Sequence, residues 1–114
     1  MNNDILALRE IEWAERKNLS KLDLSGYELE RLPDLLFHIS TLRDLNLSGN
    51  HIREIPDQID LLNLTTLNLS RNLISDLPSQ FANLSKMRRL NRSDNKITNS
   101  EMLFSRLKLF HALQ

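Results

Sequence analysis

One nine-residue phrase recurs along this chain and constrains its fold more than any other feature. Each copy opens with leucine or methionine, and a second leucine follows three residues later, flanked by polar residues. The four copies begin at Leu19, Leu42, Leu64 and Met87, so they are spaced by 23, 22 and 23 residues. Repetition at this period indicates a stack of similar coils, in which each coil contacts only its neighbours.

Within the phrase, core leucines alternate with polar residues, as Leu45 and Leu47 do. Alternation places both side chains on one face of a short strand. An amphipathic helix would instead need apolar residues three, four and seven apart. Valine is absent and isoleucine supplies only 8 of the 46 apolar residues, so the strands must follow from pattern rather than from β-branched propensity.

The rest of each unit predicts a turn, an inner anchor and an outer arc. A buried asparagine after the strand can bond the backbone of a turning chain, and stacked copies would form a ladder. A later proline fixes φ where the chain swings to the outer side. The asparagines are Asn50, Asn72 and Asn95, and the prolines are Pro33, Pro56 and Pro78. Further core positions are Leu29, Ile52, Ile74 and Ile97; Leu32, Ile55 and Leu77; Leu36, Ile59 and Phe81; and Ile39, Leu62 and Leu84.

The phrase Leu-x-x-Leu-x-Leu-x-x-Asn-x-Ile-x-x-Ile-Pro-x-x-Ile-x-x-Leu resembles the leucine-rich repeat family, in its intracellular, cysteine-free, 23-residue form. Residues 11–33 resemble the start of repeat arrays in bacterial and protist signalling proteins, some of which carry a Ras-like GTPase farther along. The resemblance implies an α/β fold, a leucine-rich repeat solenoid with a right-handed coil and parallel strands on its concave side. Four repeats are expected, at residues 19–41, 42–63, 64–86 and 87–99, the last of them degraded.

Residues 1–18 are expected to form a helix that caps the first coil. Trp13 and Leu6 lie off its apolar face, and they either cover the open edge of the first repeat or form a docking patch. Capping is the preferred interpretation, because an uncovered first coil would expose its core. The apolar face gathers Ile5, Ala7, Leu8, Ile11 and Ala14.

The last unit departs from the pattern. Arg92 stands where the other repeats have an inward leucine, so it should extend toward solvent, pair with Asp94 or Glu101, or contact a partner. Residues 100–114 have helical spacing and are expected to form a closing helix, with apolar residues at Met102, Leu103, Leu107, Phe110 and Leu113. A further possibility is that the reading frame is a fragment of a longer array.

Catalytic and cofactor chemistry finds no support in the sequence. Cysteine is absent, which removes thiol nucleophiles and zinc–thiolate sites. His38, His51 and His111 fall on different coils, and Gly26 and Gly49 cannot form a phosphate-binding loop. We therefore predict a protein that is not an enzyme and that has no cofactor and no metal site.

Location is inferred from the same composition. The absence of cysteine suits a reducing compartment. The first ten residues lack a basic leader before an apolar run, and no stretch approaches the roughly 18 apolar residues that span a bilayer. A cytoplasmic protein is expected.

Charge is balanced overall but not along the chain. With 15 basic and 15 acidic side chains, neither nucleic acid nor a membrane is the expected partner. Residues 1–80 carry a net charge of −5 and residues 81–114 a net charge of +5. This is either an ordinary solvated surface, or a basic cluster that meets an acidic partner, or the basis of head-to-tail self-association of a protein that is otherwise monomeric. The basic cluster consists of Lys86, Arg88, Arg89 and Lys96.

The first functional hypothesis is a protein–protein interaction module, either a small adaptor or the recognition part of a signalling protein, that binds a partner through its concave face. The second is a structural or self-associating element, or a truncated fragment of a larger GTPase- or kinase-containing protein without activity of its own. The candidate partner-binding residues are Arg43, Asp44, Asn46, Thr66, Asn68, Arg71, Arg88, Arg89 and Asn91.

Overall fold

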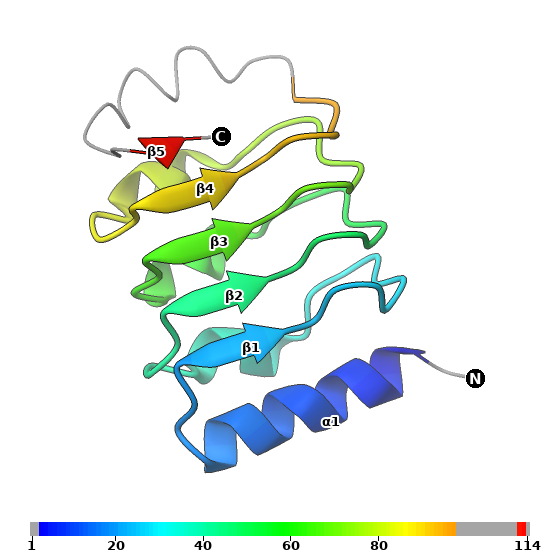
Figure 1. Ribbon diagram of the computed structural model, residues 1–114, viewed down its shortest axis with the longest axis vertical. Coiled ribbons are helices and arrows are strands. Elements are labelled where there is room, and N and C mark those ends of the chain that lie inside the picture. Colours follow the sequence, from blue (N-terminus) through cyan, green and yellow to red (C-terminus); the bar gives the residue numbers. More distant parts are fainter. Residues whose placement is uncertain (1–2, 98–111, 114) are drawn as a thin grey trace.

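A computed structural model describes residues 3–97 and 112–113 and shows one continuous stack of coils (Figure 1). The five strands pair in parallel in the order β1-β2-β3-β4-β5, so each strand neighbours the next one in the chain. Lys21 faces Asp44, Asp44 faces Thr66, and Thr66 faces Arg89, so one step across the sheet is one repeat. The elements are α1 (Asn3–Arg16), β1 (Lys21–Asp23), β2 (Asp44–Asn46), β3 (Thr66–Asn68), β4 (Arg89–Asn91) and β5 (Ala112–Leu113). The predicted α/β solenoid is confirmed.

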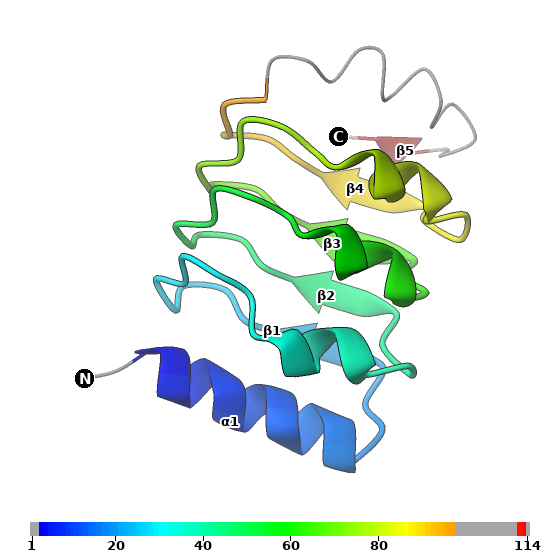
Figure 2. The same ribbon diagram turned by 180° about the vertical axis from the view of Figure 1, so that it is seen from behind.

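Short 3₁₀-helices form the outer side of the coils, and in Figure 2 they lie in front of the sheet. They are η1 (Asp34–His38), η2 (Asp57–Leu61) and η3 (Ser79–Asn83). The residue before each is a proline, with φ of −61° at Pro33, −72° at Pro56 and −68° at Pro78. Because the ring fixes φ near this value, the proline sets the direction in which the chain turns outward.

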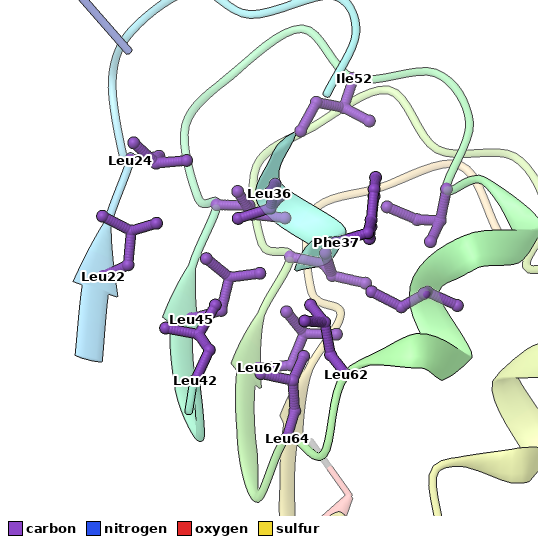
Figure 3. Close-up of a cluster of buried hydrophobic side chains, with 14 of the residues drawn as sticks. Leu22, Leu24, Leu36, Phe37, Leu42, Leu45, Ile52, Leu62, Leu64 and Leu67 are labelled. Atoms are coloured by element: carbon purple, nitrogen blue, oxygen red, sulfur yellow. The ribbon is translucent and has the colours of Figure 1, made fainter. Parts of the chain in front are cut away.

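The interior is a ladder of aliphatic side chains shared by neighbouring coils (Figure 3). Leu24, Leu47 and Leu69 are fully buried from the strand side. From the outer arc, the three anchors at Leu36, Ile59 and Phe81 are fully buried as well. One core residue was not anticipated, since Phe37 beside Leu36 is also buried. At about 1.5–3 kcal/mol for each buried side chain, only the joined stack offsets the entropy of ordering the coils.

The predicted asparagine ladder is present and links the coils through their backbones. Asn72 lies at 4% exposure, its Oδ1 accepts the N–H of Ile52 at 3.0 Å, and its Nδ2 donates to the carbonyl of Leu47 at 2.8 Å. Nδ2 also lies 3.1 Å from the carbonyl of Leu69. Asn50 and Asn95 repeat this arrangement one coil away on either side. The ladder satisfies backbone groups that a tight turn would otherwise leave unpaired.

Helix α1 caps the first coil, but through a narrower stripe than expected. It packs against β1 and η1, and Ala7, Ile11 and Ala14 are fully buried. Ile5 and Leu8 were expected on the buried face, yet they are 56% and 37% exposed. The two alanines let the helix approach the coil closely, so only the residues at i, i+4 and i+7 reach the core.

Trp13 covers the edge of the first repeat only in part, where it lines a hollow with Leu35 of η1, and Leu6 is half-buried. Trp13 is 48% exposed, and its ring lies 4.9 Å from Nζ of Lys17 and 6.0 Å from the guanidinium carbon of Arg16. Helix α1 ends at Arg16; in the turn that follows, Asn18 has a φ of +52°, and the N–H of Leu19 donates to the carbonyl of Ala14. This is a Schellman-type end, which turns the chain sharply into β1.

The end of the chain corrects one prediction. Most of the helix expected over residues 100–114 lies outside the described residues, but Ala112 and Leu113 form β5, so the helical prediction is wrong there. Ala112 pairs with Arg89 and Leu113 with Leu90. The physical reason is that β4 offers unpaired backbone groups at its edge, and a parallel strand satisfies them.

Candidate functional site

The concave strand face is formed by the side chains that alternate with the core leucines on β1–β4. One row runs across the sheet at the first strand position and another at the third. The first row is Lys21, Asp44, Thr66 and Arg89, and the second row is Asp23, Asn46, Asn68 and Asn91. Thr66 and the three asparagines are half-buried, whereas Lys21, Asp23 and Arg89 are exposed. The exposed groups therefore lie at the two ends of the face.

Three of the candidate residues serve the turn that follows each strand. The Oδ1 atoms of Asn46, Asn68 and Asn91 accept the backbone N–H of the serine two residues later, at 2.9–3.0 Å. The hydroxyls of Ser70 and Ser93 also donate to Oδ1 at 2.7 Å. These Asx turns occupy the acceptor oxygens and give the asparagines a structural role.

Arg43 also has a structural role. Its Nη1 donates to the carbonyls of Ser40 and Leu42 at 3.0 and 2.9 Å. The carbonyl of Arg43 accepts the N–H groups of Thr65 and Thr66 from the next coil. Part of the guanidinium therefore braces the loop before β2 and is committed to the fold.

Arg71 occupies a backbone position that favours glycine. Its φ is +56°, and the equivalent positions of the two preceding repeats are Gly26 at +71° and Gly49 at +65°. Its N–H donates to the carbonyl of Ser93 at 3.0 Å, so the conformation is fixed by the next coil. The exposed side chain stands at the end of the strands, where the chain turns away from the concave strand face.

Arg88 and Arg89 are exposed candidate residues whose side chains the fold leaves available. Their backbone N–H groups donate to the carbonyl of Thr65 at 2.8 and 3.0 Å. Within residues 3–97 and 112–113, neither guanidinium makes a hydrogen bond or an ion pair. A fixed backbone with two free planar forks suits the recognition of carboxylates.

A shallow hollow lies at the other end of the concave strand face, over β1 and β2. It is lined by Lys21, Leu22, Asp23, Asp44 and Asn46. Two carboxylates and one ammonium give this hollow a net charge of −1. Asp44 and Asn46 were predicted as binding residues from the sequence, whereas Lys21 and Asp23 were not, although both belong to the same repeated rows.

One titrating group lies beside this end. Partial burial raises the pKa of the Tyr27 hydroxyl above its ordinary value, and the nearby carboxylates of Glu10 and Asp23 add to the rise. Tyr27 therefore stays neutral at physiological pH and adds no charge to the hollow.

Outside the concave strand face, the described residues offer fewer features that could bind a ligand or a partner. A second hollow lies beside the loops that precede η1 and η2, and it is lined by Glu30, Arg31, Leu32, Arg53, Glu54 and Pro56. Among the described residues, no group of three acidic or histidine side chains converges as a metal site would need. No helix in that part of the chain is both long enough and apolar enough to cross a bilayer.

Residues 40–83 match the family model of leucine-rich repeats in two copies. This chain is a leucine-rich repeat protein. Such folds are typically recognition modules rather than catalysts, so the coarse function is protein interaction. The match lies over the repeats that keep both the inward leucines and the asparagine ladder.

Curated relatives share the repeats. The human volume-regulated anion channel subunit LRRC8D is 42% identical over 47 residues, which are 41% of this chain and 6% of that protein. A probable serine/threonine-protein kinase of Dictyostelium discoideum is 39% identical over 85 residues, which are 75% of this chain and 5% of that protein. This leucine-rich repeat chain thus spans only about a twentieth of these relatives.

Solved structures show the same fold. The leucine-rich repeat domain of the type III effector XopL has a TM-score of 0.72 at 27% identity, over 84% of this chain and 33% of that one. The leucine-rich repeat domain of APL1B also has a TM-score of 0.72, at 26% identity, over 96% of this chain and 33% of that one. A leucine-rich repeat protein of Leptospira interrogans supports the fold alone, with a TM-score of 0.66 at 22% identity over 90% of this chain and 33% of that one.

Proposed function

We propose that this leucine-rich repeat protein binds another protein through its concave strand face. The observation that carries the proposal is the state of Arg89, which lies on this face, and of Arg88 directly before β4: within the described residues both are exposed and unused by the fold. Stacked repeats present an extended concave surface of this kind to their partners. The fold uses the asparagine row and part of Arg43, so the proposed binding residues reduce to the charged ends of the face and Arg71.

The wider role that we propose is that of a small adaptor or of the recognition part of a signalling protein. The similarity to the repeats of a probable kinase supports the second form, since those repeats are a small part of a much longer protein. The partner would be a protein rather than nucleic acid or a membrane, because the chain has no net charge. A cytoplasmic location stays a prediction.

The test compares two faces that carry equal numbers of arginines. In one variant Arg88 and Arg89 are both changed to glutamate. In the control, Arg31 and Arg53 beside the second hollow are changed to glutamate, which alters the net charge by the same amount. Each protein is immobilised, and the proteins that it captures from a lysate of its source cells are compared by mass spectrometry.

We expect the concave variant to lose a protein that the wild type and the control variant both retain. The reason is that reversing two exposed charges at an interface replaces attraction by repulsion, which slows association and suppresses binding. If both variants lost the same captured protein, the result would count against binding through the concave strand face. The same conclusion would follow if neither variant changed the set of captured proteins.

Self-association is a second candidate, and the uneven charge favours it. The first 80 residues carry a net charge of −5 and the remainder +5, so the two ends of neighbouring copies could attract one another. Light scattering at several protein concentrations in low salt would then show growth in mass, which about 0.5 M salt would reverse by screening. A constant monomer mass would exclude this candidate.

A further inference from the structure

Charge differs between the two ends of the concave strand face: Asp23 and Asp44 lie with Lys21 on β1 and β2, whereas the charged residue of β4 is Arg89, with Arg88 directly before it. The residue before each strand and the first residue of the strand occupy equivalent places in all four repeats. In β2 this pair is Arg43 and Asp44, in β3 it is Thr65 and Thr66, and in β4 it is Arg88 and Arg89. The repeat can therefore use neutral residues at these places, and the arginine pair of β4 is a local feature of that coil.

The opposite end carries charge that the fold does not require. Asp23 accepts the N–H of Ser25 at 2.9 Å and its hydroxyl at 2.7 Å, as the asparagines of the later repeats do in their own turns. An amide oxygen serves this Asx turn equally well, so the negative charge of Asp23 is additional. Together with Asp44 it outweighs the single ammonium of Lys21 among the residues that line the hollow, while the guanidinium of Arg43 is held by the carbonyls of Ser40 and Leu42.

The two ends are far enough apart to act separately. Three steps between parallel strands, at about 4.8 Å each, place β1 roughly 14 Å from β4. This exceeds the Debye length of about 8 Å at physiological ionic strength, so the ends do not cancel one another. An extended segment that rises about 3.3 Å per residue would cross this distance in about four residues.

From these observations we infer that the concave strand face takes a partner segment in one direction only. Carboxylates of the segment lie on Arg88 and Arg89, and a lysine or arginine about four residues away lies in the hollow beside Asp23 and Asp44. The inference rests on the proposed function and adds the chemistry and the polarity of the partner. The β4 end contributes more, because within residues 3–97 its two arginines make no ion pair with an acid, whereas the hollow includes Lys21.

A charge-patterned peptide is the probe. It carries two lysines and two glutamates, separated by three glycine and serine residues, and a spin label is attached at either its lysine end or its glutamate end. The full chain is labelled with ¹⁵N, and the loss of amide signal near the spin label is recorded during titration to millimolar peptide. We expect the glutamate-end label to broaden amides of β4 and the lysine-end label to broaden those of β1 and β2.

Variants copied from neighbouring repeats test the two ends without disturbing the turns. The change of Arg88 and Arg89 to threonine reproduces β3 and is expected to weaken peptide binding about tenfold. The change of Asp23 to asparagine reproduces the later Asx turns. With Asp44→Thr added, it is expected to weaken binding about threefold and to remove the preference for one direction.

The outcomes separate this inference from the proposed function. Identical broadening from both labels, or an unchanged affinity after the arginines are replaced, would overturn the polarity and leave concave binding intact. Broadening that maps to α1 or to the outer arc would overturn both. The absence of any change at millimolar peptide would overturn the inference alone, since capture of a protein partner is measured independently.

Discussion

The two central repeats (residues 42–86) differ from the fourth repeat in the identity and burial of the residues at equivalent positions. Leu47 and Leu69 are fully buried, whereas Arg92 takes the same place in the fourth coil and is half-buried with its Nε atom shielded from solvent. Asn72 is 4% exposed, whereas Asn95 is half-buried. The central coils are thus built for packing. The fourth coil gives up part of that packing and carries the available arginines.

This comparison predicts that the asparagine ladder is stronger in the middle of the stack. Replacing Asn72 by alanine would leave the buried N–H of Ile52 without its side-chain acceptor. The carbonyls of Leu47 and Leu69 also lose a bond to Asn72, but each keeps a bond to another asparagine of the ladder. We expect a loss of about 3 kcal/mol in the free energy of unfolding, measured by urea denaturation.

The matching change at the fourth coil should cost less. Asn95→Ala frees the N–H of Ile74, but water can reach this half-buried turn, so a loss of about 1 kcal/mol is expected. Asn63→Ala, on the exposed outer arc, is the control and should stay within about 0.5 kcal/mol of wild type. Equal losses at Asn72 and Asn95 would contradict the difference between the repeats.

The second prediction concerns a substitution that gives the fourth coil the inward leucine of the central repeats. Arg92→Leu should stabilise the protein by about 1–3 kcal/mol, because an apolar side chain would join the leucine ladder in place of a partly desolvated charge. The measurement is again the urea midpoint, with Arg88→Leu as the exposed control that should bring no gain. A lower midpoint for Arg92→Leu would show that position 92 does not belong to the ladder.

Period and polar spacing together predicted most of this fold. The repeat length placed Leu22, Leu45, Leu67 and Leu90 in register, and Asn50 and Asn72 in the ladder, because each role depends only on position within one coil. The orientation of α1 depends instead on how closely the helix approaches the first coil. Its exposed Ile5 and Leu8 therefore did not follow from helical periodicity.

Two further points had signals in the sequence that competing patterns obscured. Leu113 follows Leu90 by one repeat length, yet the helical spacing of the residues before it suggested a helix instead of β5. Asn46 stands two residues before Ser48, as Asn68 does before Ser70, which is the spacing of an Asx turn. Recognising these two spacings would have assigned Leu113 to the sheet and the asparagines to the turns, and so removed the asparagines from the residues available to a partner.

The smallest predicted effect concerns the turn at Arg71, where the third repeat departs from the first two. A non-glycine residue with a φ of +56° is strained by about 1–2 kcal/mol, and glycine relieves that strain at an entropic cost of about 0.5–1 kcal/mol. Arg71→Gly should therefore raise the free energy of unfolding by about 0.5–1 kcal/mol in a urea titration.

The reciprocal change isolates the backbone contribution. A Cβ at Gly49 would meet the backbone nitrogen of Gly26 at 3.8 Å, which is an ordinary contact, so Gly49→Ala carries conformational strain without a clash. The free energy of unfolding of the Gly49→Ala variant should be about 1 kcal/mol lower than that of the wild type. If Arg71→Gly fails to stabilise while Gly49→Ala destabilises as expected, the Arg71 side chain must itself contribute to folding. Arg71 would then be committed to the fold, as Arg43 is, and would no longer belong to the proposed binding residues.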